Sequence, residues 1–214
     1  DKSLTHPPVL TDTIYVDSAA VGNNDGTSWE HAFTDLQDAL DKAELFDEIW
    51  IAKGTYHPIR AEYGYPPPSF KSRTFFIQTP VYLYGGFNGT ESTLSQRDSN
   101  YLDSNKTVLS GYIPDSGYVH VVMTLFFGFV EADGLTVSGG SKSNGVVALG
   151  ADLRFYNCRI ADTKGDSMYL DAFQGMYEFE NCIFENNHSI EKGGAIFARS
   201  HATLEGLESG SLKI

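Results

Sequence analysis

A repeat of about 23 residues in the second half of the chain constrains the fold more than any other feature of the sequence. Residues 130–137, 153–160 and 177–184 align with one another, and each alternates apolar and polar side chains before a Gly or Asn. Alternation with a period of two predicts a β-strand. One strand per repeat cannot bury its own apolar face, so the copies must stack, with neighbouring strands about 4.8 Å apart. The repeat therefore predicts an all-β solenoid.

The alignment also predicts which side chains lie above one another. Gly134, Asn157 and Asn181 form a turn column, because Asn tolerates left-handed backbone and can hydrogen-bond to its stacked neighbour. A disulfide between the two cysteines is geometrically possible. Reduced core thiols are favoured, since side chains stacked in parallel rarely point at each other. The predicted inward columns are Ala132, Phe155 and Phe179 before the turn, and Leu135, Cys158 and Cys182 after it.

Two weaker copies of the repeat are expected at residues 203–207 and 108–113, the second with Gly111 in the place of Gly134. Residues 193–197 open a further coil, and no covering segment follows them before Ile214. We therefore expect a solenoid that is truncated or open at its C-terminal end. An open end exposes core and strand edges, which would permit end-to-end self-association.

The first part of the chain has a different pattern. Residues 34–37, Thr-Asp-Leu-Gln, have the form of a capping box, and a helical apolar stripe follows through Leu36, Ala39, Leu40 and Ala43. This short helix lies between strand-like segments, and it would cover the first coil of the solenoid. Strands are expected at residues 13–16, 48–52, 75–78, 81–84 and 119–122.

The chain reads as one domain preceded by a short segment. Residues 1–12 would be a tether and residues 13–214 the solenoid, of which 13–56 are the cap and first coil. Residues 57–72, rich in proline, would leave the solenoid as an excursion, and residues 73–214 would form the successive coils.

Two motifs of the first part resemble a known family. FTDLQDAL at residues 33–40 and DEIWIAKGTY at residues 47–56 resemble the opening of bacterial pectin-lyase-like proteins. The resemblance implies a right-handed parallel β-helix with a short N-terminal capping α-helix. Further segments look like the next landmarks of one bacterial branch: VYLYGGF at 81–87, GTE at 89–91, QRD at 96–98 and VLSG at 108–111.

A third motif lies near the C-terminal end. FENN at residues 184–187, followed by GGAI at 193–196, resembles the repeat of polymorphic outer-membrane proteins, which are adhesins and autotransporter passengers. This resemblance implies an extracytoplasmic protein that is secreted or associated with the cell surface or outer membrane.

The charge of the chain disfavours several classes of partner. The formal net charge is −13, with only 15 Lys and Arg residues. Such a surface repels phosphate backbones, so nucleic acid and anionic lipid are not expected as partners. No apolar run reaches the roughly 18–20 residues of a membrane helix, so no transmembrane segment is expected.

The outward side chains of the repeat are the best candidate site. Two carboxylates flanking a sugar can act as acid and base, although carboxylates two coils apart would be separated by about 10 Å. The alternative is a solvated strand face on which an arginine neutralises its acidic neighbours. The candidates are Glu131, Arg154 and Glu178 in one column, and Asp133, Tyr156 and Glu180 in the next.

Aromatic rings supply a second kind of candidate. Tyr63, Tyr65 and Phe70 in the excursion, together with Tyr156, could stack on sugar rings or contact a protein, or could pack against the solenoid instead. Residues 23–27, NNDGT, look superficially like a Ca²⁺ loop, but they lack the ligand pattern and are better explained as a turn. No metal site or cofactor is predicted, and a role for Ca²⁺ is a weak alternative.

Two hypotheses about function follow. The first is a non-enzymatic surface or secreted scaffold that binds a polysaccharide or a surface protein. The second is a polysaccharide lyase or glycoside hydrolase that uses the outward carboxylates. Fold alone does not decide between them, because function depends on the site.

Overall fold

A computed structural model describes residues 12–60, 69–140, 144–171, 176–189, 194–199, 203–205 and 212–213, and shows a mostly β protein with few helices. The predicted tether lies almost wholly outside these residues. The strands are β1 (Thr13–Val16), β2 (Asp47–Ala52), β3 (Gly54–Tyr56), β4 (Phe75–Ile77), β5 (Val81–Phe87), β6 (Thr107–Ser110), β7 (Tyr112–Ile113), β8 (Gly117–Tyr118), β9 (Val121–Asp133), β10 (Leu135–Ser138), β11 (Asn144–Tyr156), β12 (Arg159–Ala161), β13 (Asp166–Asp171), β14 (Met176–Glu180), β15 (Cys182–Glu185), β16 (Ile196–Arg199), β17 (Thr203–Glu205) and β18 (Leu212–Lys213). The helical elements are α1 (Leu36–Lys42), η1 (Phe70–Ser72), η2 (Leu94–Gln96) and α2 (Tyr101–Ser104).

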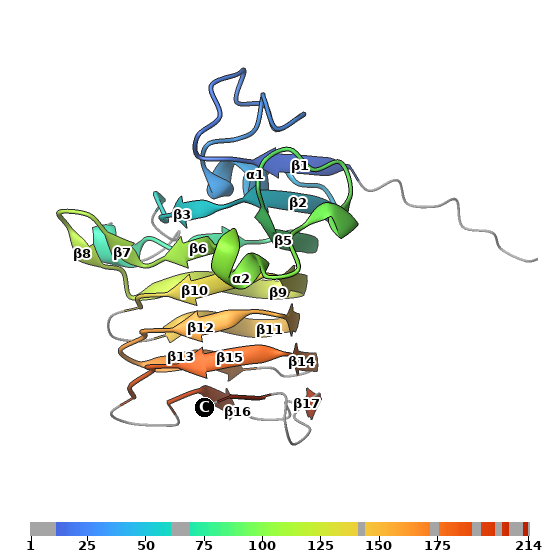
Figure 1. The fold of residues 1–214 in the computed structure, drawn as a ribbon. Helices are drawn as coiled ribbons and strands as arrows, with labels where there is room; N and C mark the ends of the chain where they lie inside the picture. Colours follow the sequence, from blue (N-terminus) through green and yellow to red (C-terminus); the bar gives the residue numbers. More distant parts are fainter. Residues whose placement is uncertain are drawn as a thin grey trace, which may run out of the picture.

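Two parallel sheets make up most of the molecule. The larger, sheet A, has the order β1-β2-β5-β9-β11-β13-β16, with β4, β14 and β17 paired beside this path. The smaller, sheet B, has the order β3-β6-β10-β12-β15-β18. From β9 onward the chain passes alternately through sheet A and sheet B, and each pass pairs with the one before it (Figure 1). We call one such pass a layer.

The long strands of sheet A bend in the middle. The first part of β11 pairs with β13, and its last part pairs with β14. Left-handed backbone marks the bends, at Phe127 and Gly128 in β9 (φ 55° and 94°) and at Gly150 in β11 (φ 63°). The buried side chains of both sheets and of α1 belong to one core.

The predicted core columns are confirmed. Phe155 is in register with Ala132 on one side and with Phe179 on the other, and all three side chains are buried. Leu135, Cys158 and Cys182 form the second buried column, and both cysteines are free thiols. Burial of each large apolar side chain contributes about 1.5–3 kcal/mol, so the columns hold the layers together.

The turn column is also confirmed. Gly134, Asn157 and Asn181 all have left-handed backbone, with φ of 76°, 49° and 53°. Asn181 Nδ2 donates to Asn157 Oδ1 at 3.3 Å, and Asn157 Nδ2 donates to Asp133 Oδ2 at 3.3 Å. These bonds link successive layers at the corner between the two sheets.

Of the two weaker copies of the repeat, the one at residues 108–113 was aligned wrongly. β6 pairs with β10 so that Thr107 lies opposite Leu135. Gly111, which follows β6, therefore corresponds to Gly139, which follows β10. It does not correspond to Gly134. Tyr84 is the true counterpart of Asp133, because residues 88–106 are inserted between β5 and β6. The other copy begins where it was expected, because β17 starts at Thr203 and pairs with β14, with Leu204 opposite Tyr177.

The first helix forms with a different cap from the predicted one. Asp35 is the N-cap, and its carboxylate accepts from the Gln37 backbone N–H at 2.7 Å. Thr34 instead donates to the Asn24 side chain. The apolar stripe is confirmed, since Leu36, Ala39, Leu40 and Ala43 all belong to the core, and α1 lies at the β1 end of the stack (Figure 1).

Replacement of Asn157 by alanine tests the turn column. Asn157→Ala should lower the free energy of unfolding by about 1–2 kcal/mol, because alanine tolerates left-handed backbone poorly. Asn157→Gly should cost less, since glycine adopts this conformation freely although it loses the same hydrogen bonds. Denaturant unfolding of both variants measures the difference. Equal losses of unfolding free energy in the two variants would contradict the idea that Asn157 is needed for its left-handed backbone conformation.

The two thiols should be unreactive while the protein is folded. Burial raises the pKa of Cys158 well above its ordinary value and that of Cys182 to about 11, so neither forms the nucleophilic thiolate near neutral pH. Alkylation by iodoacetamide, followed by mass spectrometry, should modify both cysteines only in denaturant. Rapid alkylation of the native protein would contradict their place in the core.

Candidate functional site

The first outward column is an ion-paired ladder. Arg154 on β11 lies opposite Glu131 on one side and Glu178 on the other. Its Nη1 is 3.9 Å from a Glu131 carboxylate oxygen, and its Nε is 3.5 Å from one of Glu178. The guanidinium also lies 5.3 Å from the centroid of the Phe129 ring. The structure thus brings these three predicted residues together, with the arginine between the two acids.

The carboxyl of Glu131, in this column, has a raised pKa. Partial burial raises its pKa, Arg154 opposes that shift, and the neighbouring Asp133 and Glu178 carboxylates add to it. A raised carboxyl pKa is a property that a general acid needs. The neighbouring arginine keeps the ionised form favourable, so the same group also serves an ion pair.

The second outward column contains a more buried network. Asp133, Tyr156 and Glu180 are in register, as predicted. Asp133 accepts from Tyr101 Oη at 2.8 Å and from Arg97 Nη1 at 3.2 Å, in addition to the bond from Asn157. The Asp133 and Arg97 side chains are only 17% and 11% exposed. This carboxylate therefore anchors the inserted residues 88–106 to sheet A.

Aromatic rings enclose the arginine of this network. The Arg97 guanidinium lies 4.7 Å from the Tyr101 ring centroid, 5.7 Å from that of Tyr84 and 5.6 Å from that of Phe87. Arg97 Nη1 also donates to the Gly85 carbonyl at 3.1 Å. Sequence reasoning missed Arg97 and Tyr101, because nothing in the repeat relates the inserted segment to Asp133.

The remaining residues of the second column are more open. Burial and a hydrogen bond to Glu178 raise the pKa of Tyr156 to about 12, so its phenol stays protonated near neutral pH. Glu180 is exposed at the end of β14. The hydrogen bond between Tyr156 and Glu178 joins the second column to the first, so the candidates on the two columns are neighbours on one face of sheet A.

The predicted aromatic site is only partly described. Tyr63 and Tyr65 lie outside the described residues. Phe70 begins η1, and its ring centroid is 5.9 Å from Lys71 Nζ. A different aromatic group lies on sheet A, where Tyr82 is 5.6 Å from Phe129 and 6.3 Å from Phe46, measured between ring centroids.

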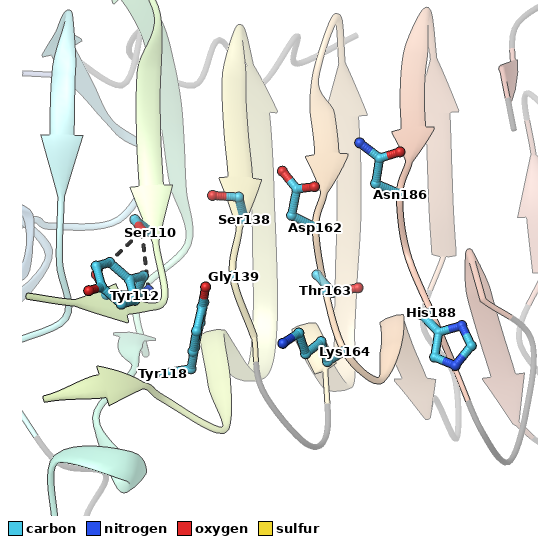
Figure 2. Close-up of a pocket in the computed structure, with 10 residues that line it drawn as sticks. All are labelled: Ser110, Tyr112, Tyr118, Ser138, Gly139, Asp162, Thr163, Lys164, Asn186 and His188. Carbon is cyan, nitrogen blue, oxygen red and sulfur yellow. Dashed lines mark hydrogen bonds between the residues drawn. The ribbon is translucent and has the colours of Figure 1, made fainter.

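A hollow of about 520 Å³ lies at the ends of the sheet B strands, where sequence reasoning placed nothing (Figure 2). The hairpin of β7 and β8 forms one side of it, and the corners after β10, β12 and β15 form the other. The signal that could have found it is a second turn column at the repeat spacing. Its members are Gly139, Asp162 and Asn186, with φ of 82°, 55° and 54°.

A second hollow, of about 420 Å³, lies over the inserted residues 88–106. Glu91 fills part of it and accepts from the backbone N–H groups of Asn88, Gly89 and Thr90 at 2.7–3.0 Å. Burial acts to raise the Glu91 pKa, but the backbone hydrogen bonds outweigh it and lower the pKa overall. The carboxylate is thus a structural centre of this loop.

Metal-binding and membrane-spanning features can be judged for the described parts of the chain. Within these ranges, no three His, Cys, Asp or Glu side chains gather closely enough to hold a metal ion. Nor is any helix there long and apolar enough to cross a membrane. Residues 23–27 form turns in which Asp25 accepts from Thr27.

Comparison with known proteins gives one partial match. A family model described as the Chlamydia polymorphic membrane protein repeat matches residues 181–199, which include β15 and the strand β16. Searches of curated proteins and of solved structures find no match. The repeat match agrees with the resemblance at residues 184–196, and in general terms it supports a surface-exposed, adhesin-like chain outside the cytoplasm.

Removal of the Asp133 carboxylate should destabilise the protein more than removal of Glu178. Asp133→Ala leaves the largely buried Arg97 without its carboxylate partner, so the free energy of unfolding should fall by about 2–4 kcal/mol. Amide hydrogen exchange in residues 88–106 should also become faster. Glu178→Ala removes a more exposed pair and should cost less than about 1 kcal/mol. Denaturant unfolding and hydrogen exchange of both variants provide the measurement; similar losses would contradict the anchoring role of Asp133.

Proposed function

We propose that this chain is a surface-exposed, adhesin-like binding module, built as a right-handed parallel β-helix with α1 as its N-terminal cap. Its ligand would be a glycan or a protein on another surface. The match of residues 181–199 to the polymorphic membrane protein repeat carries this proposal. The alternation of the chain between two parallel sheets supports the architecture, since such layers arise when repeats of this length stack.

The state of the outward carboxylates supports a binding role over catalysis. Arg154 neutralises Glu131 and Glu178, and Arg97, Tyr101 and Asn157 all bond to Asp133. A catalytic carboxylate needs room for a substrate oxygen or a water molecule. Here the same oxygens already bind side chains of neighbouring layers or of the inserted residues 88–106, so their first role is structural.

An enzyme remains the second candidate because of Glu131. Its raised pKa suits a general acid, and Glu178, two strands away, would be roughly 10 Å distant, at the far edge of the separation in inverting hydrolases. A lyase or hydrolase would therefore use Glu131 as acid and Glu178 as base, with Arg154 between them.

One pair of assays separates the two candidates. Beads coated with the intact chain should adhere saturably to cultured epithelial cells, and soluble folded chain should compete with them. The same protein, incubated with neutral and anionic polysaccharides with and without Ca²⁺, should release neither reducing ends nor unsaturated products.

The matched variants are Glu131→Gln and Glu185→Gln, which remove one carboxylate each from sheet A and from sheet B. Cleavage that is lost in Glu131→Gln but kept in Glu185→Gln would establish the enzyme in place of the binding module. Folded chain that neither adheres nor competes would overturn the adhesin-like proposal.

A further inference from the structure

The hollow beside sheet B has an aromatic wall that is open to solvent. Tyr112 and Tyr118 face each other across the β7–β8 hairpin, with ring centroids 5.0 Å apart and an angle of 56° between the rings. Their residues are 45% and 39% exposed. Tyrosine rings present large apolar faces with a polar edge, and partly exposed rings at the mouth of a hollow are surfaces on which a sugar can pack.

The opposite wall is a ladder of polar groups at the repeat spacing. Asp162 and Asn186 occupy the same corner of successive layers, and both have left-handed backbone. Lys164 and His188 follow them, two residues further along in each layer. Figure 2 shows these residues at the corner, with the Lys164 amine pointing toward Tyr118, and all four line the hollow. Neighbouring layers are about 4.8 Å apart, so the polar groups are spaced at a regular interval.

Backbone hydrogen bonds hold the polar wall in place. The Lys164 N–H donates to the Gly140 carbonyl at 2.8 Å, and the His188 N–H donates to the Thr163 carbonyl at 2.9 Å. Asn187 Oδ1 accepts from both the backbone N–H and the hydroxyl of Thr163, at 3.1 Å and 2.9 Å. Lys164 also reaches across the hollow, where its Nζ lies 5.5 Å from the Tyr118 ring centroid.

We propose that this hollow binds a neutral saccharide, with a sugar ring stacked on Tyr118 and its hydroxyls bonded to Asp162, Lys164 and Asn186. Sugar hydroxyls both donate and accept, and the wall offers both functions: the carboxylate accepts, the ammonium donates and the amide does each. The volume of about 520 Å³ lies within the usual range for small-ligand sites.

The charges and shape argue against other ligands. A phosphate or an acidic sugar would meet Lys164 but also Asp162, on a chain with a formal net charge of −13. A protein partner typically needs about 800 Å² of complementary surface on each side. This site is a hollow of about 520 Å³, which suits a small ligand better. A neutral sugar can hydrogen-bond to both walls and brings no charge that would repel either side chain.

This inference rests on the proposed binding function and names its ligand class. The test is isothermal titration of the intact chain with cellobiose, lactose and chitobiose at millimolar concentrations, followed by a neutral-glycan array. Tyr118→Ala should weaken saccharide binding about tenfold or more, whereas Tyr118→Phe should keep most of the affinity. Asp162→Asn should also weaken saccharide binding, and asparagine tolerates the left-handed backbone at this position. Phe127→Ala, which removes a 75% exposed ring outside the hollow, is the matched control.

The outcomes distinguish this inference from the proposed function. Binding that depends on Tyr118 and Asp162 but not on Phe127, in variants with unchanged thermal unfolding, would establish the saccharide site. Folded chain that binds no neutral saccharide, or binds equally well as Tyr118→Ala, would overturn it. Bead adhesion that persists in Tyr118→Ala alongside absent saccharide binding would overturn the inference and leave the adhesin-like function standing. Adhesion lost in Tyr118→Ala and blocked by protease treatment of the cells would replace the saccharide with a protein ligand.

Discussion

The parallel register between successive layers is the constraint on which the rest of the structure depends. A slip of one residue between β9 and β11 would move Phe155 to the solvent side and Arg154 into the core, so the apolar columns tolerate no such shift. The corners reinforce the register from outside the core. Asn157 and Asn181 lie at equivalent corners of successive layers and bond to each other, so each corner repeats the backbone conformation of the one before it.

The charges of the outer face follow from this register. Each of three arginines lies near carboxylates from other parts of the stack: Arg154 between two neighbouring strands, Arg97 over Asp133, and Arg159 near Asp103 and Glu185. Their contributions differ with burial. The Arg97 side chain is 11% exposed and lies among aromatic rings, so loss of its partner costs more than the loss of an acid beside the 39% exposed Arg154. A strongly acidic chain thus uses its few arginines to hold layers together.

The sequence predicted the features that depend on the period and missed those that depend on insertions. Ala132, Phe155 and Phe179 could be aligned because their offsets are 23 and 24 residues, and the even alternation of a strand then set which side is buried. Gly111 was misplaced because residues 88–106 interrupt the period ahead of it. The contacts of Arg97 and Tyr101 with Asp133 join segments more than 30 residues apart, and no local pattern encodes them. The second corner column, Gly139, Asp162 and Asn186, was within reach of the same alignment, since its spacing equals that of the first.

The insertions explain how such a stack can gain a binding site without losing its fold. Residues 88–106 leave after β5 and return before β6, and both strands still pair in register with β9 and β10. The β7–β8 hairpin leaves after β6 and returns before β9 in the same way, and it places two tyrosines opposite a corner whose backbone is already fixed. Side chains that project from the corners, such as Asp162 and Lys164, are free of the packing that constrains the strand interiors. The side chains at the corners can therefore differ from protein to protein while the buried columns keep the register. For this reason the hollow at the corner is a better candidate for ligand binding than the ion-paired face of sheet A.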